Sequence, residues 1–302
     1  MEITFLGTSS AVHSATRSHP AIIMQAFGET MLFDCGEGTQ RQLIYAKISP
    51  MKISKIFISH YHGDHILGIP GLLQSMNFRG REKKLTVYGP RGLDELKNAV
   101  YSLSFPNLGF PNFKFPIDWI EIETGTVIED KDYIIKSQKV DHNTISLAYS
   151  IEEIKKPRFL RQNAIELGVP VGPKFGKLHN GEEVEVDGRI IKPEQVLGPP
   201  RKGHKITYSG DTRRCEEMIQ FARDSTVLIH ESTYVKEDYD KADEYAHSTS
   251  TDAAEIALQS NSKQLILTHF STRYTEFEEL LDDAKKIFKN TILAEDLMKV
   301  EL

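Results

Sequence analysis

Four short apolar runs in the chain each lead directly into residues of the metal-ligand type. The runs lie at 56–58, 205–208, 226–229 and 264–267, and the residues that follow them include His60, Asp211, His230 and His269. Short apolar runs of this kind predict buried strands. In open sheets covered by helices, active sites lie at the carboxyl ends of the strands. With helices expected at 214–222, 250–259 and 276–288, the chain is predicted to form a two-sheet α/β fold with one shared site.

The first half of the chain predicts a similar alternation of elements. Strands are expected at 2–6, 20–27, 30–34 and 85–88, and helices at 39–46 and 92–101. The segments 119–123, 126–128 and 133–140 alternate like strands of one antiparallel sheet. Residues 105–116 are rich in Phe and Pro. We expect this connection to cover the core rather than to stack on nucleotides.

Residues 59–65 contain three histidines and one aspartate around Gly63. His60 and His62 project to one side in an extended chain, whereas Asp64 and His65 follow the glycine and can face a second ion. Imidazole nitrogen suits Zn²⁺ and its first-row neighbours, and a carboxylate adds the charge that holds a further cation. The alternative is a solvated polar turn. The density of ligand-type residues favours a hydrolytic site with two metal ions.

Three further residues are expected to complete the ligand sets. Two ions need about four protein ligands each, with one shared. The shared ligand must be a carboxylate, because an imidazole nitrogen cannot bind two metals. Asp211 is the best candidate, since it follows a strand end beside Gly210, and His142 and His269 also follow apolar runs. Taken singly, each is more simply explained as a hydrogen-bonded group at a strand end.

The remaining histidines need separate interpretations. Those in loops are expected to be solvated or to contact substrate: His13, His19, His179 and His204. Of the adjacent His230 and Glu231, one is expected to point inward as a structural group. His247 precedes a helix for which Ser248 or Ser250 is the expected N-cap. Alternatively, His247 is a proton donor that Glu231 orients near the metals, because imidazole titrates near neutral pH.

The charge distribution sets one segment apart. The net charge of −6 argues mildly against nucleic-acid binding, yet residues 155–205 contain 11 Lys and Arg against 6 Asp and Glu. The segment is also rich in Gly and Pro, and a long irregular stretch inside a domain is unusual unless it is functional. We expect a single domain over 1–302 into which a protruding basic arm, 155–203, is inserted. Within the arm, 184–186 and 189–191 are expected to form a hairpin.

The expected location is a reducing cytoplasm without a membrane partner. Cys35 and Cys215 form neither a disulfide framework nor a CxxC motif. The first residues lack a signal-peptide pattern. No apolar run approaches the roughly 20 residues that span a bilayer.

The spacing His60-x-His62-x-Asp64-His65, with the later His142, Asp211 and His269, resembles hydrolases of the metallo-β-lactamase superfamily. A closer resemblance is carried by the segments 5–10, 33–40, 62–71, 230–233, 246–249 and 267–274. Together they are similar to the short form of the ribonuclease Z family of tRNA 3′-processing endonucleases, over nearly the whole chain. The chain departs from the family pattern at Ser232, where Ala is usual. In the loop 12–19, the chain also lacks a proline and an Arg-Asn pair that are usual in the family. The resemblance therefore does not imply phosphate contacts by this loop.

The resemblance implies a fold and a metal centre. The fold would be an αβ/βα sandwich, in which two mixed sheets pack face to face with helices outside. Each subunit would bind two Zn²⁺ ions, with Mn²⁺ as an alternative. One ion would take His60, His62, His142 and Asp211, and the other Asp64, His65, Asp211 and His269.

The resemblance also implies a reaction on precursor tRNA by a homodimer. Asp64 would accept a proton from the attacking water, and His247, held by Glu231, would protonate the departing ribose 3′-oxygen. The cut would follow the discriminator nucleotide, leaving a tRNA 3′-OH and a trailer with a 5′-phosphate. The candidate substrate contacts are Ser271 and Arg273 near the cut and Lys174 and Lys177 on the arm.

Two other functions compete with this one. A small-molecule phosphodiesterase or thioesterase of the same fold would use the same metals, but the basic arm speaks against it. An RNA-binding module with an inactive metal site is disfavoured because the ligand set is complete.

Overall fold

The structure is a computed structural model that describes residues 1–105 and 113–302. The chain divides into two compact units. The larger, here called the body, comprises Met1–Glu129, Ile134–Ile151 and Lys205–Leu302, and the smaller, here called the arm, comprises Asp130–Tyr133 and Glu152–His204. Each unit has a hydrophobic core of its own.

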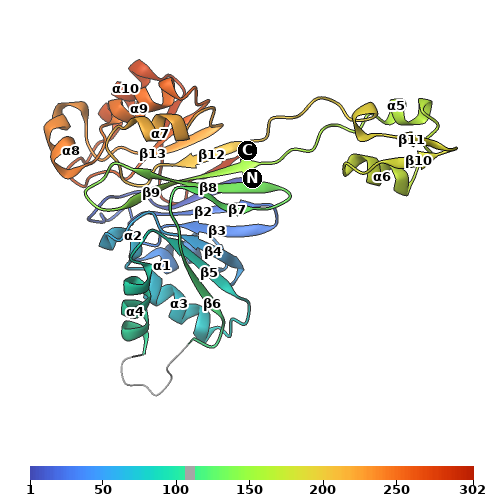
Figure 1. The fold of residues 1–302 in the computed structure, drawn as a ribbon. Coiled ribbons are helices and arrows are strands. Elements are labelled where there is room, and N and C mark those ends of the chain that lie inside the picture. Colours follow the sequence, from blue (N-terminus) through green and yellow to red (C-terminus); the bar gives the residue numbers. More distant parts are fainter. Residues whose placement is uncertain (106–112) are drawn as a thin grey trace. The chain divides into compact units, whose positions relative to one another are not determined.

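The first sheet of the body contains seven strands. Their order is β16 (Lys299–Glu301), β1 (Glu2–Gly7), β2 (Ala21–Ala26), β3 (Glu29–Phe33), β4 (Ile53–Phe57), β5 (Leu85–Gly89) and β6 (Ile117–Glu121). The strands from β16 to β3 pair antiparallel, and those from β3 to β6 pair parallel. The helices that cover this sheet are α1 (Thr39–Tyr45), α2 (Gly63–Ile66), α3 (Ile69–Phe78) and α4 (Leu93–Ser104), with the 3-10 turn Pro50–Lys52 (Figure 1). Leu43, Leu72 and Val100 of these helices share one buried hydrophobic core with Ile56 of the sheet.

One strand of this sheet differs from the sequence-based prediction. The segment expected at 119–123 was predicted to share an antiparallel sheet with the two segments after it. Instead, β6 pairs parallel with β5 at the edge of the first sheet. The helix α4 lies between β5 and β6 in the chain, and a parallel pair needs such a crossover connection. The prediction was wrong because local alternation does not reveal which strand is the partner.

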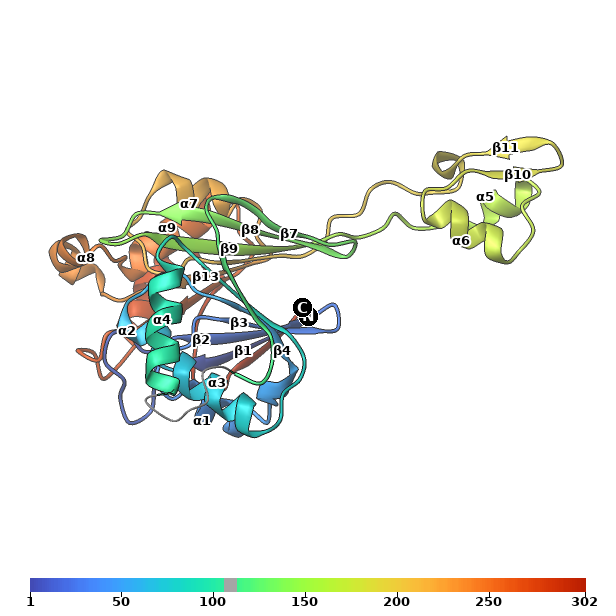
Figure 2. The same ribbon diagram turned by 60° about the horizontal axis from the view of Figure 1, so that its bottom comes forward.

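The second sheet also contains seven strands. Their order is β15 (Thr291–Leu293), β14 (Leu265–Thr268), β13 (Val227–Glu231), β12 (Lys205–Tyr208), β9 (Ser146–Glu153), β8 (Tyr133–Val140) and β7 (Gly125–Glu129). Strands β12 to β15 are parallel, and β7 and β8 are antiparallel. On the outer side of this sheet, Figure 1 shows the helices α7 (Glu216–Phe221), α9 (Ser250–Gln259) and α10 (Glu278–Ile287), and Figure 2 shows α7 and α9 from another side. The 3-10 turn Lys236–Asp238 and α8 (Tyr239–Tyr245) precede α9.

Aromatic side chains fill the space between the two sheets. The ring centroids of Phe33 and Phe57 lie 4.9 Å apart, and Tyr149 of the opposite sheet lies 5.4 Å from Phe57. Tyr149 donates a hydrogen bond to the carbonyl of Ile58 at 2.6 Å, so its hydroxyl is satisfied although the ring is fully buried. The predicted sandwich of two mixed sheets with outer helices is confirmed.

Two local predictions have mixed outcomes. The N-cap of α9 is Thr249, between the two predicted serines, and it forms a capping box with Asp252. In the Phe-rich and Pro-rich connection, Phe113 and Phe115 are buried in the first core, as expected for a covering segment. The prediction for residues 106–112 lies outside the described residues.

The arm is more regular than its composition indicates. Strands β10 (Val184–Val186) and β11 (Arg189–Ile191) form the expected antiparallel hairpin, and Asp187 and Gly188 in its turn have φ of 49° and 76°. The helices α5 (Arg161–Glu166) and α6 (Pro173–His179) and the 3-10 turn Pro193–Gln195 were not anticipated. Their apolar residues share a small core with the hairpin that includes Ala164, Val169, Leu178, Val184 and Val196.

Within the described ranges, no helix has the length and apolar character needed to cross a bilayer.

Candidate metal centre

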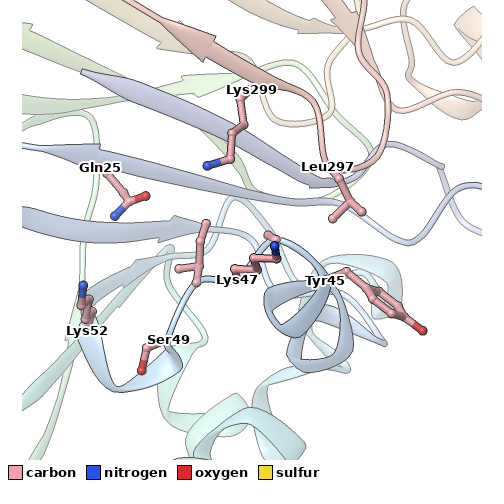
Figure 3. A pocket seen from close by; sticks show the side chains of 9 residues that line it. Gln25, Tyr45, Lys47, Ser49, Lys52, Leu297 and Lys299 are labelled. Atoms are coloured by element: carbon pink, nitrogen blue, oxygen red, sulfur yellow. The ribbon is translucent and has the colours of Figure 1, made fainter.

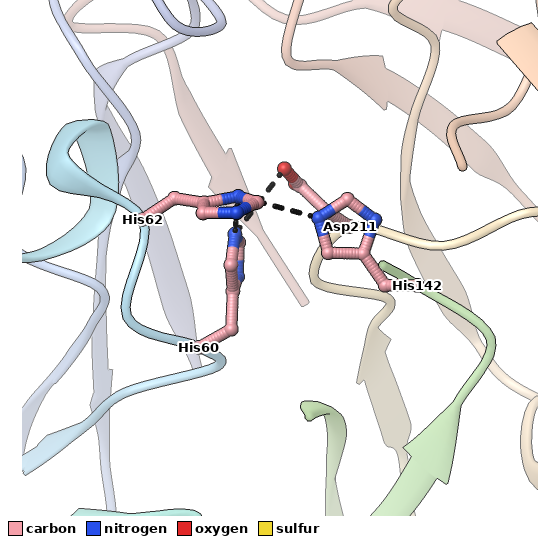
Figure 4. Close-up of side chains that lie close together, drawn as sticks. All are labelled: His60, His62, His142 and Asp211. Atoms are coloured by element: carbon pink, nitrogen blue, oxygen red, sulfur yellow. Dashed lines mark hydrogen bonds and ion pairs between the residues drawn. The ribbon is translucent and has the colours of Figure 1, made fainter. Parts of the chain in front are cut away.

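Four side chains from distant parts of the body meet in a first group. His60 and His62 follow β4, His142 follows β8, and Asp211 follows β12 (Figure 4). His60 Nε2 lies 3.0 Å from His62 Nδ1 and 3.6 Å from Asp211 Oδ2, and His142 Nε2 lies 3.3 Å from His62 Nδ1. All these donor atoms face a common point, as in a coordination sphere.

Asp64, His65 and His269 form a second group beside the first. His65 Nε2 and His269 Nε2 are 3.4 Å apart, and each lies 3.4 Å from Asp64 Oδ2. Asp211 Oδ2 lies 3.4 Å from His65 Nε2 and 3.3 Å from His269 Nε2. Asp211 therefore stands between both groups, in the position expected of a shared carboxylate.

Residues outside the two groups hold the imidazole rings in place. His65 Nδ1 lies 2.8 Å from Asp34 Oδ2, and His142 Nδ1 donates to the carbonyl of Ala246 at 2.7 Å. His269 Nδ1 lies 2.8 Å from Thr233 Oγ1. When one ring nitrogen is engaged in this way, the tautomer and the direction of the other nitrogen are fixed, as in many metal-binding histidines.

Asp34 was not identified from the sequence as part of the site. It is fully buried with φ of 54°, and it accepts hydrogen bonds from the Ser59 backbone at 2.7 Å and from the Tyr208 hydroxyl at 2.7 Å. The carboxylate thus links both sheets to His65. The available signal was an acidic residue at the end of a buried strand, directly before Cys35-Gly36.

The residues fit two divalent cations. Two atoms that bind one Zn²⁺ at about 2.1 Å in tetrahedral geometry lie about 3.4 Å apart, close to the separations within both groups. In the part of the chain that the structure describes, Asp211 Oδ1 is buried without a hydrogen-bond partner. Such an orphaned carboxylate oxygen is costly unless an ion or water satisfies it. Burial and the neighbouring His65 lower the pKa of His60, so its ring is neutral and able to ligate.

His247 and Glu231 form a pair beside the two groups of ligand-type side chains. His247 Nδ1 lies 2.8 Å from Glu231 Oε1 and 3.9 Å from Asp211 Oδ2. Glu231 also accepts from the Thr212 backbone at 2.9 Å and from Thr233 Oγ1 at 2.6 Å, so its position is fixed. Burial alone lowers the pKa of His247, but the Glu231 carboxylate outweighs it and raises the pKa to about 9. Neighbouring side chains of a strand point to opposite faces, so His230 lies on the other face of β13 from Glu231.

The contacts found for the candidate substrate-binding residues are with residues outside the two groups of ligand-type side chains. Arg273 Nη1 lies 3.4 Å from Asp238, and the backbone N–H of Arg273 donates to Ser271 Oγ at 3.3 Å. On α6 of the arm, Lys174 donates to the carbonyl of Glu185 at 2.6 Å, while Lys177 is exposed. Of the two roles predicted for His19, solvation is wrong because only 6% of this residue is exposed, and contact with the substrate stays a prediction.

A basic pocket of about 390 Å³ lies elsewhere on the body and shares no residue with the metal ligands. Figure 3 shows Lys47, Lys52 and Lys299 around it. Lys299 is engaged by Glu2 at 3.0 Å. The pocket has the charge to attract anions, but it lacks the buried polar contacts of the metal cluster.

Comparison with known proteins supports a common origin over the whole chain. Ribonuclease Z from Methanothermobacter thermautotrophicus is 53% identical over 302 residues, which cover 100% of this chain and 97% of that protein. Ribonuclease Z from Bacillus cereus is 44% identical over 305 residues, covering 98% of each. The crystal structure of human tRNase Z, short form, has a TM-score of 0.69 and 27% identity, and covers 100% of this chain and 99% of that one.

Two family descriptions match parts of the chain. Residues 1–151 match the family described as anti-Pycsar protein Apyc1, and residues 190–270 match the beta-lactamase superfamily domain. The second match includes Asp211 and His269 of the two groups and the adjacent pair Glu231 and His247.

Proposed function

Because the chain belongs to the ribonuclease Z family, we propose that it removes the 3′ trailer of precursor tRNA by cutting after the discriminator nucleotide. As a ribonuclease Z it is a hydrolase that cuts RNA phosphodiester bonds in tRNA 3′ processing. The observation that supports the finer proposal is the convergence of six ligand-type side chains on a seventh, Asp211, with the His247–Glu231 pair beside them. The cut leaves a tRNA 3′-OH and a trailer with a 5′-phosphate.

The two groups of side chains would hold one divalent ion each, with Zn²⁺ the expected metal and Mn²⁺ the alternative. His60, His62, His142 and Asp211 form one ligand set, and Asp64, His65, His269 and Asp211 form the other. When bound, such ions provide a nucleophilic water at neutral pH and neutralise charge on the phosphate.

The side chains of the chain itself position the proton transfers. Asp64 is ionised, since burial raises its pKa but His65 and His269 hold it well below its usual value. Its carboxylate accepts a hydrogen bond, and then the proton, from the attacking water. The Nδ1–H group of His247 donates a hydrogen bond to Glu231 Oε1, so the other ring nitrogen, Nε2, is left to interact with the substrate. From Nε2, His247 protonates the departing ribose 3′-oxygen.

We assign binding of the tRNA body to the arm. Its segment carries an excess of positive charge while the rest of the chain is acidic, and Lys177 is exposed on α6. Cationic side chains that meet phosphates give affinity without sequence specificity. Near the cut, Ser271 and Arg273 contact neighbouring phosphates. Arg273 leaves its ion pair with Asp238 to bind a phosphate.

We further propose that the working form is a homodimer in the cytoplasm. Large apolar side chains are exposed on the helices of the first sheet, including Phe78 at 87% and Ile44 at 64%, and such residues are candidates for burial between subunits. Both cysteines are free, as in a reducing compartment. Sedimentation equilibrium measures the mass independently of shape, and a monomer at all concentrations would contradict the dimer.

Cleavage of an end-labelled precursor tRNA tests the function. A cut after the discriminator nucleotide is expected, and prolonged chelation should abolish it. Hydrolysis of bis(p-nitrophenyl) phosphate, measured in parallel, distinguishes the small-molecule alternative. Activity on that ester without cleavage of precursor tRNA would contradict the proposal, and cleavage that survives removal of all metal would exclude the two-ion site.

A further inference from the structure

A third group of ligand-type side chains lies outside the metal centre. His13, His19 and Glu37 each place one ligand atom within 4.8 Å of the others. His13 and His19 come from the loop between β1 and β2, and Glu37 precedes α1. His13 and Glu37 are exposed, whereas His19 is buried. None of these residues belongs to the two ligand sets of the catalytic centre.

The imidazole of His19 lacks a hydrogen-bond partner among the described residues. It is 94% buried, and neither Nδ1 nor Nε2 has a hydrogen-bond partner among the residues that the structure describes. A buried polar group without a partner is rare in folded proteins, and an ion or an ordered water is its usual explanation. Burial lowers the pKa of His19, so the ring is neutral, as metal ligation requires.

The backbone holds His19 in a fixed position. A Cβ atom added to Gly7 would lie 1.8 Å from the His19 carbonyl oxygen, and one added to Gly36 would lie 2.4 Å from His19 Cβ. The chain therefore passes between two glycines that allow this close approach. His19 is thus held beside the residue that precedes Glu37.

The rest of the loop is tied to the body just as firmly. Arg17 donates to Thr8 Oγ1 at 2.6 Å and to the Ala294 carbonyl at 2.8 Å, and its guanidinium lies 4.4 Å from the ring centroid of Phe277. The Ser18 backbone donates to Asp296 at 2.7 Å. These contacts fix the part of the loop next to His19, so little reorganisation of His19 is needed to form a site.

We propose that His13, His19 and Glu37 bind one further divalent first-row transition ion, such as Zn²⁺ or Co²⁺. Two imidazoles and one carboxylate are a ligand set that such ions favour, with a remaining position for water. His13 and Glu37 line a cavity of about 410 Å³, which gives that water access from solvent. This ion adds to those of the proposed catalytic centre, which keeps its own ligands.

Metal stoichiometry tests the site without reference to activity. Untagged wild-type protein, His13→Ala and Glu37→Gln are equilibrated with buffered Zn²⁺ or Co²⁺, and the metal per chain is measured by mass spectrometry. Wild type is expected to bind one ion more than either variant at a concentration that saturates it. Loss of one ligand should weaken this ion by more than about tenfold, since even indirect partners of ligands contribute that much. The test compares the metal content of wild type with that of each variant, so its result does not depend on the number of ions that the catalytic centre binds.

Controls separate this site from general metal uptake. His204→Ala removes a half-buried histidine of the arm and should keep the wild-type count. Arg41 lines the same cavity but cannot bind a cation, so Arg41→Ala should also keep the wild-type metal count. Nitrogen-detected NMR of the histidine rings should show His19 shifting with the last equivalent of metal in wild type. Equal counts in wild type, His13→Ala and Glu37→Gln, with no shift of His19, would overturn the proposal.

Discussion

The body and the arm hold their candidate functional side chains in opposite ways. In the body, His60 and His65 have no exposed surface and Asp211 is 2% exposed, and each ring is fixed by a further partner. In the arm, Lys177 is exposed to solvent on a helix of seven residues. Buried polar networks fail as a unit when one member is lost, whereas exposed charges contribute small, salt-sensitive and nearly independent amounts. Changes in the body should therefore affect the chemistry, and changes in the arm should affect only the choice of substrate.

Asp211→Ala should produce the largest effect, because it removes the carboxylate shared by both ligand groups. Metal assistance contributes several kcal/mol to hydrolysis, so we expect a loss of at least about 10³-fold on both precursor tRNA and bis(p-nitrophenyl) phosphate. The metal content should fall with it. Asp141→Ala is the matched control, since Asp141 is exposed beside His142. A variant that kept its metal and its activity would remove Asp211 from the site.

Replacing the arm should separate the two substrates. Lys155 and Arg201 form an antiparallel bridge, so residues 156–200 can be exchanged for a short Gly-Ser turn without stretching the chain. We expect kcat/KM for precursor tRNA to fall by roughly 10³-fold, as for the loss of several phosphate contacts. Hydrolysis of the small ester should stay within about twofold of wild type, on the premise that distant sites act independently.

The salt dependence of the same variant sharpens this result. With the arm present, log kcat/KM should fall steeply with log salt concentration, and without it the slope should be shallower. An unchanged slope and intact processing would show that tRNA is bound by the body alone.

His247→Ala should show an intermediate effect that depends on the leaving group. A general acid contributes about 10² to 10⁴-fold when the leaving oxygen needs a proton, so single-turnover cleavage of precursor tRNA should slow by at least about 10²-fold. The activated ester releases a stable anion, and its hydrolysis should change little. Glu231→Gln should follow the same pattern more weakly, because it acts through His247. Equal losses on both substrates would indicate a role in metal binding instead.

The sequence predicted which ligand-type residues come together better than it predicted their surroundings, for a physical reason. His60, His62 and His65 are close in sequence, and strand ends meet at one edge of a sheet, so their grouping follows from local rules. Asp34, directly after β3, reaches His65 in helix α2 through a tertiary contact, and β6 pairs with β5 across a crossover. Neither relation leaves a periodic signal in the chain.

In the arm, the sequence predicted the hairpin but not the helices. Its hairpin was visible because Asp187-Gly188 supplies the positive φ angles of a tight turn. Helix α6 contains Pro173 and Gly176 and is too short to be stable alone. It forms because Leu178 packs into the arm core with Phe175 against it, which is tertiary information.

Gly36→Ala should destabilise the body and disturb its site. The added Cβ would lie 2.2 Å from the carbonyl oxygen of Asp64 and 2.4 Å from His19 Cβ. Forced overpacking of this kind costs about 2 kcal/mol or more, which thermal unfolding will detect. Because Asp64 must move, metal affinity should fall as well. Unchanged stability and metal affinity would show that the segment around Gly36 relaxes freely.

Gly176→Ala in the arm should have the smallest effect and the opposite sign. Gly176 lies inside α6, and a Cβ there meets no described atom within 4 Å. Replacing a helical glycine by alanine stabilises a helix by about 0.5–1 kcal/mol, so exchange of the α6 amides should slow by up to about fivefold. Because the arm and the body have separate cores, amide exchange in the body should not change. Slower exchange in both units would mean that they unfold together, and the contrast between a rigid catalytic body and an independent arm would then fail.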